Sequence, residues 1–165
     1  MSKITLVEVG MRDGLQNESV NLSIAQRFEF AQKLAAAGCK RIEAGAFVSP
    51  QKVPQMANSK ELLDQILKAQ KKKKFPQDIT FSALVPNEQG YNDARSVGVK
   101  EVAVFGAVSE TFSRKNINCS VNESLEKFRQ VIALAKKDKV RVRGYVSTVF
   151  GCPYEGKIKA SQALK

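Results

Sequence analysis

The chain contains no histidine, and its three cysteines, Cys39, Cys119 and Cys152, stand far apart with no CxxC pair among them. The absence of histidine removes the commonest general base and the commonest transition-metal ligand. An odd number of widely spaced cysteines argues against a disulfide framework. A metal site on this chain must therefore use oxygen ligands or borrow imidazole groups from elsewhere.

Long apolar runs are absent as well. Apolar residues make up 43% of the sequence, but no stretch approaches the ~18 consecutive apolar residues that a membrane helix needs. The first ten residues, MSKITLVEVG, run directly into a strand-like pattern and leave no room for a signal or transit peptide. We therefore expect a cytoplasmic protein with no membrane partner.

Positive charge exceeds negative charge, since 27 Lys and Arg face 16 Asp and Glu for a net charge of +11. Such a balance fits a nucleic acid, an anionic membrane surface or a polyanionic small molecule. The densest run, Lys71 to Lys74, follows a predicted helix and is typical of a solvated helix end. The aromatic residues do not interleave with the lysines as a nucleic-acid stacking surface requires, so we expect no nucleic-acid partner.

Apolar periodicity predicts strands and helices in strict alternation. The capping-box pairs Ser23 with Gln26 and Ser120 with Glu123 mark two helix starts, and Asn58 with Glu61 marks another. The expected strands cover residues 4–9, 40–44, 79–85, 101–105 and 140–146, and the expected helices cover 23–37, a segment opening at 58, 91–97, a segment opening at 120 and a start near 161.

This alternation predicts serial βα units with parallel strands, for which an open doubly wound sheet and a closed barrel compete. The first turn, GMRDGLQNE, lacks the G-x-G-x-x-G pattern of a dinucleotide fold. Long polar loops follow the strands, as at the functional face of a barrel, and a full barrel needs ~250 residues. We therefore expect α/β architecture: residues 1–165 form a single incomplete domain, a partial (β/α)₈ TIM barrel of about five parallel strands in the order 1-2-3-4-5, with helices on the convex face only.

The loop after the first expected strand concentrates polar side chains: Arg12, Asp13, Gln16, Asn17 and Glu18. A carboxylate at a strand end is a hard oxygen ligand suited to Mg²⁺ or Mn²⁺. A guanidinium there can stabilise negative charge that develops on an enolate oxygen. The residues alone leave open the simpler interpretation, a local ion pair that orders the loop.

Strand alternation places further charged residues on one face. Outward positions of a barrel strand pack on helices, so Glu8, Arg41, Glu43 and Arg143 are expected to point into the lumen and form a polar network with at least one carboxylate–guanidinium contact. For Glu8, Arg41 and Arg143 a structural role is the simpler interpretation. Glu43 and Tyr145 lie nearer the carboxyl ends of their strands, where catalytic groups sit.

Four segments together resemble the hydroxymethylglutaryl-CoA lyases, within the wider group of metal-dependent barrel lyases and Claisen-type synthases. These segments are VEVGMRDGLQNE (7–18), IEAGAFVSPQKVPQM (42–56), VFGAVSETFSRKNINCS (104–120) and RGYVSTVFGCPYEGKI (143–158). The wider group shares mainly the RDGxQ element, whereas KNINCS and GCPYEG are typical of the lyases. The resemblance spans essentially the whole chain.

The resemblance implies cleavage of 3-hydroxy-3-methylglutaryl-CoA to acetyl-CoA and acetoacetate with a divalent cation, Mg²⁺ or Mn²⁺, as in leucine degradation. It implies that Asp13 is a metal ligand and that Arg12 stabilises the enolate of the departing acetyl-CoA. It also implies that Glu43 is a catalytic acidic residue near the metal and the substrate. Gln16 and Tyr145 would line the substrate pocket together with Arg12.

The chain also departs from the family pattern. The family's two metal-binding histidines, its asparagine ligand and its catalytic cysteine fall beyond Lys165, and Ala44, Gly45 and Ala46 stand where better-known members carry hydroxyl groups. We therefore expect an incomplete metal site, an acyl-CoA substrate, no turnover by this chain alone, and self-association through open barrel edges. We also expect the open concave face to expose apolar side chains such as Leu6 and Ile42. The alternative function is a non-catalytic basic domain that binds CoA-like polyanions or nucleic acid.

Overall fold

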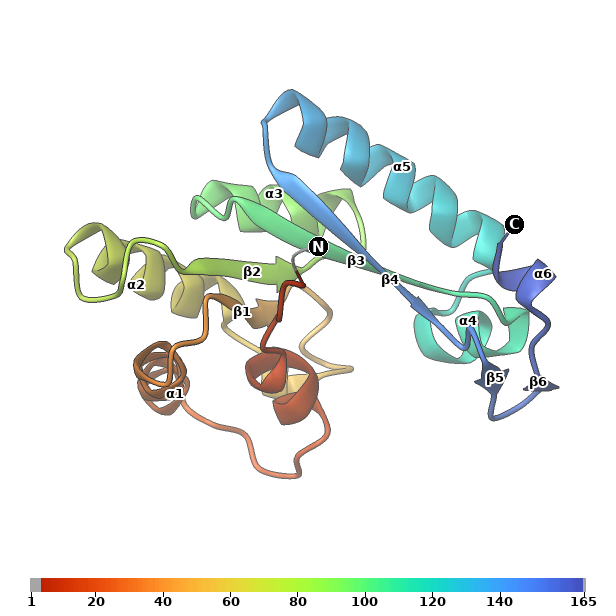
Figure 1. Cartoon of the computed structure of the whole chain (residues 1–165), viewed down its shortest axis with the longest axis horizontal. Helices are drawn as coiled ribbons and strands as arrows, with labels where there is room; N and C mark the ends of the chain where they lie inside the picture. Colours follow the sequence, from red (N-terminus) through yellow and green to blue (C-terminus); the bar gives the residue numbers. More distant parts are fainter. Residues whose placement is uncertain (1–3, 165) are drawn as a thin grey trace.

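The structure is a computed structural model that describes residues 4–164 (Figure 1). Four parallel strands form one sheet in the order β1-β2-β3-β4, and a small antiparallel hairpin, β5-β6, follows. The elements in chain order are η1 (Gly10–Gly14), α1 (Ile24–Ala36), β1 (Arg41–Ala46), η2 (Pro54–Met56), α2 (Ser59–Lys71), β2 (Thr80–Leu84), α3 (Glu88–Ser96), β3 (Glu101–Ala107), α4 (Glu110–Ile117), α5 (Val121–Lys137), β4 (Arg141–Ser147), β5 (Gly151–Cys152), β6 (Gly156–Lys157) and α6 (Ala160–Ala163).

The first expected strand, residues 4–9, lies beside β1 as predicted but pairs with it only at one parallel bridge, between Glu8 and Ile42. The Glu8 N–H donates to the Arg41 carbonyl and the Glu43 N–H donates to the Glu8 carbonyl, both at 2.8 Å. The spatial order therefore starts with residues 4–9 and continues through β1, β2, β3 and β4, which is the sequential order expected for a barrel.

The core lies on one face of the sheet. Alternate strand residues, among them Ile42, Phe81 and Val102, are buried in a single hydrophobic cluster with side chains from α1, α2, α3 and α5. Phe28 and Phe81 both stack edge-on against Phe75 at centroid distances of 5.6 and 5.2 Å. Figure 1 shows the long helices along this face. The helix layer on one face confirms the predicted partial (β/α) barrel.

The strand alternation also determines the exposure of the two apolar residues that were expected on the open concave face, Leu6 and Ile42. Leu6 is 85% exposed, as predicted, but Ile42 is fully buried. The expectation for Ile42 was wrong because its neighbours Arg41 and Glu43 occupy the concave face, which turns Ile42 toward the helices.

The three helix starts fall where the sequence signals placed them, but the capping differs at one of them. Capping boxes at Ser23 and Ser120 open α1 and α5, as predicted. Asn58 precedes α2 as expected, but it adopts a left-handed conformation, φ 57°, and its side chain makes no capping hydrogen bond. Within residues 4–164 no helix is both long and apolar enough to cross a membrane.

Helix α4 was not predicted, because the segment between the expected strand 101–105 and the helix start at Ser120 was interpreted as a polar loop. Ser109 caps its first turn by accepting from the Phe112 N–H at 3.0 Å. The hairpin β5-β6 then lies against this helix end, where the Glu155 carboxylate accepts from the Thr111 N–H at 2.7 Å. The ammonium group of Lys115 sits 4.0 Å from the ring centroid of Tyr154.

Candidate active site

The chain turns sharply after Glu8 into the π-helical turn η1. The Val9 carbonyl accepts from the N–H groups of Arg12 and Asp13 at 3.0 and 2.7 Å. The Glu8 carboxylate accepts from the Gly10 N–H at 2.6 Å, and a Cβ at Gly10 would lie only 2.7 Å from that carboxylate oxygen. The turn directs Arg12 to the concave face and leaves the Asp13 side chain 57% exposed.

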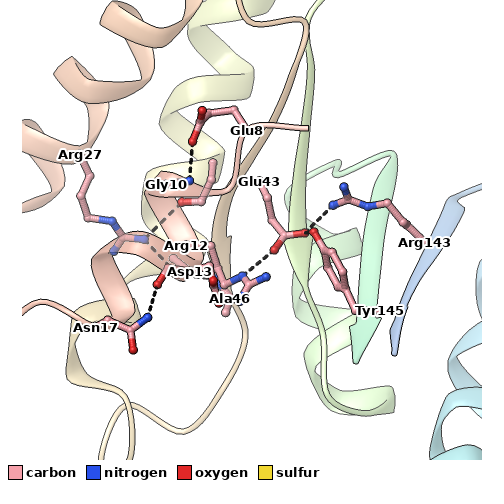
Figure 2. Close-up of polar contacts among 12 residues, drawn as sticks. Glu8, Gly10, Arg12, Asp13, Asn17, Arg27, Glu43, Ala46, Arg143 and Tyr145 are labelled. Carbon is pink, nitrogen blue, oxygen red and sulfur yellow. Dashed lines mark hydrogen bonds and ion pairs between the residues drawn. The ribbon is translucent and has the colours of Figure 1, made fainter. Parts of the chain in front are cut away.

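The centre of the site is the Glu43 carboxylate, which is fully buried on β1. Its Oε1 accepts from Arg12 Nε at 2.5 Å, and its Oε2 accepts from Arg143 Nη2 at 2.5 Å and from the Tyr145 hydroxyl at 3.0 Å. Figure 2 shows these groups converging from η1, β1 and β4. We call these four residues, Glu43, Arg12, Arg143 and Tyr145, the Glu43 cluster.

The cluster is electrostatically tight. Arg12 also donates from Nη1 to the Asp13 carboxylate at 2.5 Å. Burial alone would lower the pKa of Arg12, but the adjacent Glu43 carboxylate together with Asp13 and Tyr145 outweighs burial, so the pKa of this guanidinium lies above its ordinary value. For Tyr145, burial and then the Glu43 carboxylate both raise the pKa of the phenol. Its ring also lies 5.6 Å from the Arg12 guanidinium and 4.9 Å from that of Arg143.

Comparison with known proteins identifies the lineage. A model of the HMGL-like family matches residues 3–165. The chain belongs to the HMGL-like family. It is 48% identical over 165 residues to the hydroxymethylglutaryl-CoA lyase of Pseudomonas mevalonii, covering 100% of this chain and 52% of that protein.

Solved structures agree with this assignment. The crystal structure of hydroxymethylglutaryl-CoA lyase from Pseudomonas aeruginosa matches with a TM-score of 0.89 and 48% identity over 98% of this chain and 51% of that one. An HMG-CoA lyase from Acinetobacter baumannii, in complex with coenzyme A and 3-methylmalate, matches with a TM-score of 0.87 and 30% identity over 99% and 52%. The HMGL-like chain spans about half the length of these relatives.

The predicted polar network of this HMGL-like chain is real but divides into two groups. Arg143 contacts Glu43, which confirms the expected carboxylate–guanidinium contact. Arg41 instead pairs with Glu101 at 2.6 Å, and Arg141 joins the same carboxylate at 2.9 Å. Glu101, 2% exposed, was missed. Its alternation with the core residues of β3 is the signal that could have revealed it.

Two predicted site residues stand apart from the cluster. Gln16 is exposed beyond η1, and no hydrogen bond joins it to the Glu43 cluster within the described residues; its role as a substrate contact stays a prediction. Asp13 offers a hard carboxylate ligand of the kind that Mg²⁺ and Mn²⁺ prefer. Across residues 4–164 no group of three His, Cys, Asp or Glu side chains is placed to hold a metal ion, so Asp13 stands as a single candidate ligand.

Proposed function

We propose that this chain is the N-terminal part of a carbon–carbon lyase that cleaves 3-hydroxy-3-methylglutaryl-CoA to acetyl-CoA and acetoacetate, the reaction used in leucine degradation. One observation carries the proposal: a nearly buried guanidinium, Arg12, is held at the concave face by a fully buried carboxylate, Glu43. The membership of the HMGL-like family and the names of the relatives support the reaction class.

Arg12 is the residue that would touch the substrate. Its Nε is engaged by Glu43 and its Nη1 by Asp13, both at 2.5 Å, so the direction of the guanidinium plane is fixed in advance. The remaining N–H groups of the fork are suited to stabilise the enolate oxygen of the departing acetyl-CoA, because preorganised donors act without reorganisation when the charge develops.

The other site residues take supporting roles in this proposal. Glu43 was expected to be catalytic and close to the substrate. With both of its oxygens occupied, we assign it the task of aiming Arg12. Tyr145 and Gln16 contribute to the walls of the substrate pocket. Asp13 would supply one carboxylate to a divalent cation, Mg²⁺ or Mn²⁺.

The coenzyme A thioester is the proposed small-molecule partner, supported by the coenzyme A in the complex of the Acinetobacter relative. The cytoplasm is the proposed compartment, supported by the three cysteines, which are all free. The alternative, a non-catalytic basic domain for polyanions or nucleic acid, lacks a supporting observation. The lysine run 71–74 lies at the end of α2, before β2. It is therefore on the side of the strands' amino-terminal ends, opposite the loops that follow the strands.

Complementation tests the function. We expect no acetoacetate from the chain alone with 3-hydroxy-3-methylglutaryl-CoA and Mg²⁺. We expect turnover when the C-terminal half of the Pseudomonas aeruginosa relative is co-expressed. Removing one preorganised donor costs about 10²–10³ in kcat, so Arg12→Met in the complemented enzyme should lose that much. Lys68→Met, which breaks an exposed ion pair with Asp64, is the matched control. Restored turnover that is indifferent to Arg12→Met would refute the proposal.

A further inference from the structure

Arg27 on α1 is 1% exposed, yet within residues 4–164 no carboxylate pairs with it. Its guanidinium instead donates to the carbonyl of Ala57 at 2.8 Å, to the carbonyl of Ala44 at 3.4 Å and to the hydroxyl of Ser59 at 3.3 Å. The Nε atom is buried without a partner. Burial lowers the pKa of this guanidinium. A buried cation without a counter-ion is costly, so a hydrophobic residue would be the more stable choice at a purely structural position.

One contact of Arg27, to the Ala44 carbonyl, lies at an irregularity in β1. In the β1–β2 ladder Glu43 faces Ser82 and Gly45 faces Ala83, so Ala44 is an extra residue, a β-bulge. The Ala44 carbonyl accepts from Arg27 on the helix side of the strand.

Ser59, at the start of α2, supports the same bulge. Its hydroxyl accepts from the Ala46 N–H at 3.2 Å and donates to the Met56 carbonyl at 2.7 Å. The fit is close, because a Cβ on Gly45 would lie 2.7 Å from Ser59 Oγ and 3.2 Å from Arg27 Nη2. The bulge is thus held from α1 and from α2 at once.

We propose that Arg27 is a positioning residue of the Glu43 cluster: it locks the β1 bulge, and the bulge sets the direction in which Glu43 leaves the strand. Bulges next to active sites re-aim a side chain, and Glu43 immediately precedes the bulged residue Ala44. Figure 2 shows Arg27 on one side of Glu43 and Arg143 with Tyr145 on the other. The inference rests on the proposed function in that it takes this cluster as the active site.

The chemistry of the contacts explains why arginine stands here. The three acceptors come from separate segments, namely β1, the loop before α2 and the first residue of α2. A guanidinium presents five N–H donors in a rigid fork that can reach all three, whereas a lysine ammonium is a single point on a flexible stem. Arg27→Lys should therefore keep the charge but only part of the hydrogen-bond geometry, and Arg27→Met should keep neither.

The test reads the cluster directly and needs no turnover. Hydrogen–deuterium exchange by mass spectrometry follows the backbone of residues 41–47, and ultraviolet titration, corrected with Tyr145→Phe, follows the Tyr145 phenol. For Arg27→Met we expect exchange in 41–47 about tenfold faster or more, since a hydrogen bond from a charged donor is lost. We also expect Tyr145 to ionise at lower pH, because its contact with Glu43 loosens. Arg27→Lys should lie between wild type and Arg27→Met.

Ser113→Ala is the matched control, because Ser113 is 1% exposed and donates to the Cys119 carbonyl at 2.8 Å on α4. It should lose stability without changing either signal. If Arg27→Met loses stability while Tyr145 ionises as in the wild type, Arg27 is only a core residue and the inference is overturned. If Arg27→Met does not fold, wild-type signals in Arg27→Lys overturn it equally. A shifted Tyr145 signal without lyase activity on complementation would sink the proposed function and leave the positioning role standing.

Discussion

The Glu43 carboxylate, which is itself fully buried, receives two guanidinium donors and one phenol. Glu43→Gln removes the charge but keeps the shape, and so leaves Arg143 without its counter-ion and Arg12 with the exposed Asp13 carboxylate alone. Breaking a buried pair from one side costs about 3–5 kcal/mol. We expect a loss of that size in the free energy of unfolding, measured in urea.

The control for this prediction is Glu126→Gln, which breaks an ion pair with Arg129 whose side chains are 62% and 72% exposed. Exposed pairs of this kind contribute about 0.2–1 kcal/mol. Equal losses in the two variants would show that the Glu43 cluster carries no special weight in the fold.

Asp13 carries the prediction on metal binding. A single carboxylate, 57% exposed and already bonded to Arg12, leaves most coordination positions to water, and Mg²⁺ dehydrates reluctantly. Calorimetric titration with Mg²⁺ should therefore give heat too weak to saturate, hardly changed in Asp13→Ala. A tight site that disappears in Asp13→Ala would contradict this and require further ligands.

Single residues were predictable from the sequence where strand alternation applies. The period of two found Glu43, Arg143 and Tyr145 because a charge facing a helix layer would lack partners. It did not find Arg27, whose contacts come from other segments. The signal was present, since Arg27 lies three residues after Ile24 and four before Ala31, at the spacing of the buried helix face. The helical spacing can predict that Arg27 faces the core, but its contact with the β1 bulge is visible only in the folded structure.

Helix starts carry a prediction at the scale of elements. Ser120 accepts from the Glu123 N–H at 3.1 Å, so Ser120→Ala should cost about 1 kcal/mol in unfolding free energy.

The side chain of Asn58 makes no capping hydrogen bond, but its backbone adopts φ 57°. Asn58→Ala should therefore cost about 1–2 kcal/mol, whereas Asn58→Gly, which accepts positive φ freely, should cost much less. Thermal unfolding of the three variants decides, and an Asn58→Gly variant as unstable as Asn58→Ala would be inconsistent with a backbone role.

Two elements differ from the prediction for a physical reason: helix α4 was not predicted, and residues 4–9 form less of a strand than expected. Helix α4 has few apolar residues, and Ser113 is its one buried position in the described chain, so no apolar stripe marks it. It is held instead by Ser109 and by Glu155 from the distant hairpin. Residues 4–9 carry a strand pattern, but a strand needs partners, and in the described chain this segment meets β1 at one bridge. Both outcomes depend on contacts between segments far apart in sequence.

The whole molecule was the most predictable level, because the regular alternation of strands and helices constrains topology more than it constrains any boundary. The parallel order and the helix layer on one face follow from it. The same one-sided layer leaves the concave face and the outer edge of β4 open, since β4 pairs only with β3 among the described residues.

These open surfaces carry the last prediction, that the chain self-associates. Unpaired strand edges recruit other chains, and apolar side chains stand exposed near both edges, with Leu6 at 85%, Val146 at 59% and Phe150 at 92%. The net charge of +11 opposes association. At physiological salt, however, repulsion between charges more than ~8 Å apart is largely screened, so the open edges and the exposed apolar side chains should outweigh it. We expect light scattering at micromolar concentration to report oligomers, and co-expression with the C-terminal half of a relative to abolish them.

A pair of variants locates the association. Lysine on an edge strand blocks pairing, so Val146→Lys on β4 should shift the light-scattering mass toward the monomer. Val20→Lys adds the same charge at a residue that is 64% exposed in the loop before α1. If charge repulsion alone governed association, the two variants would behave alike. Because pairing at the open edge is the proposed cause, Val146→Lys should act and Val20→Lys should not. A wild-type chain that stays monomeric and unfolds cooperatively would mean that four strands and their helices close a stable core without further partners.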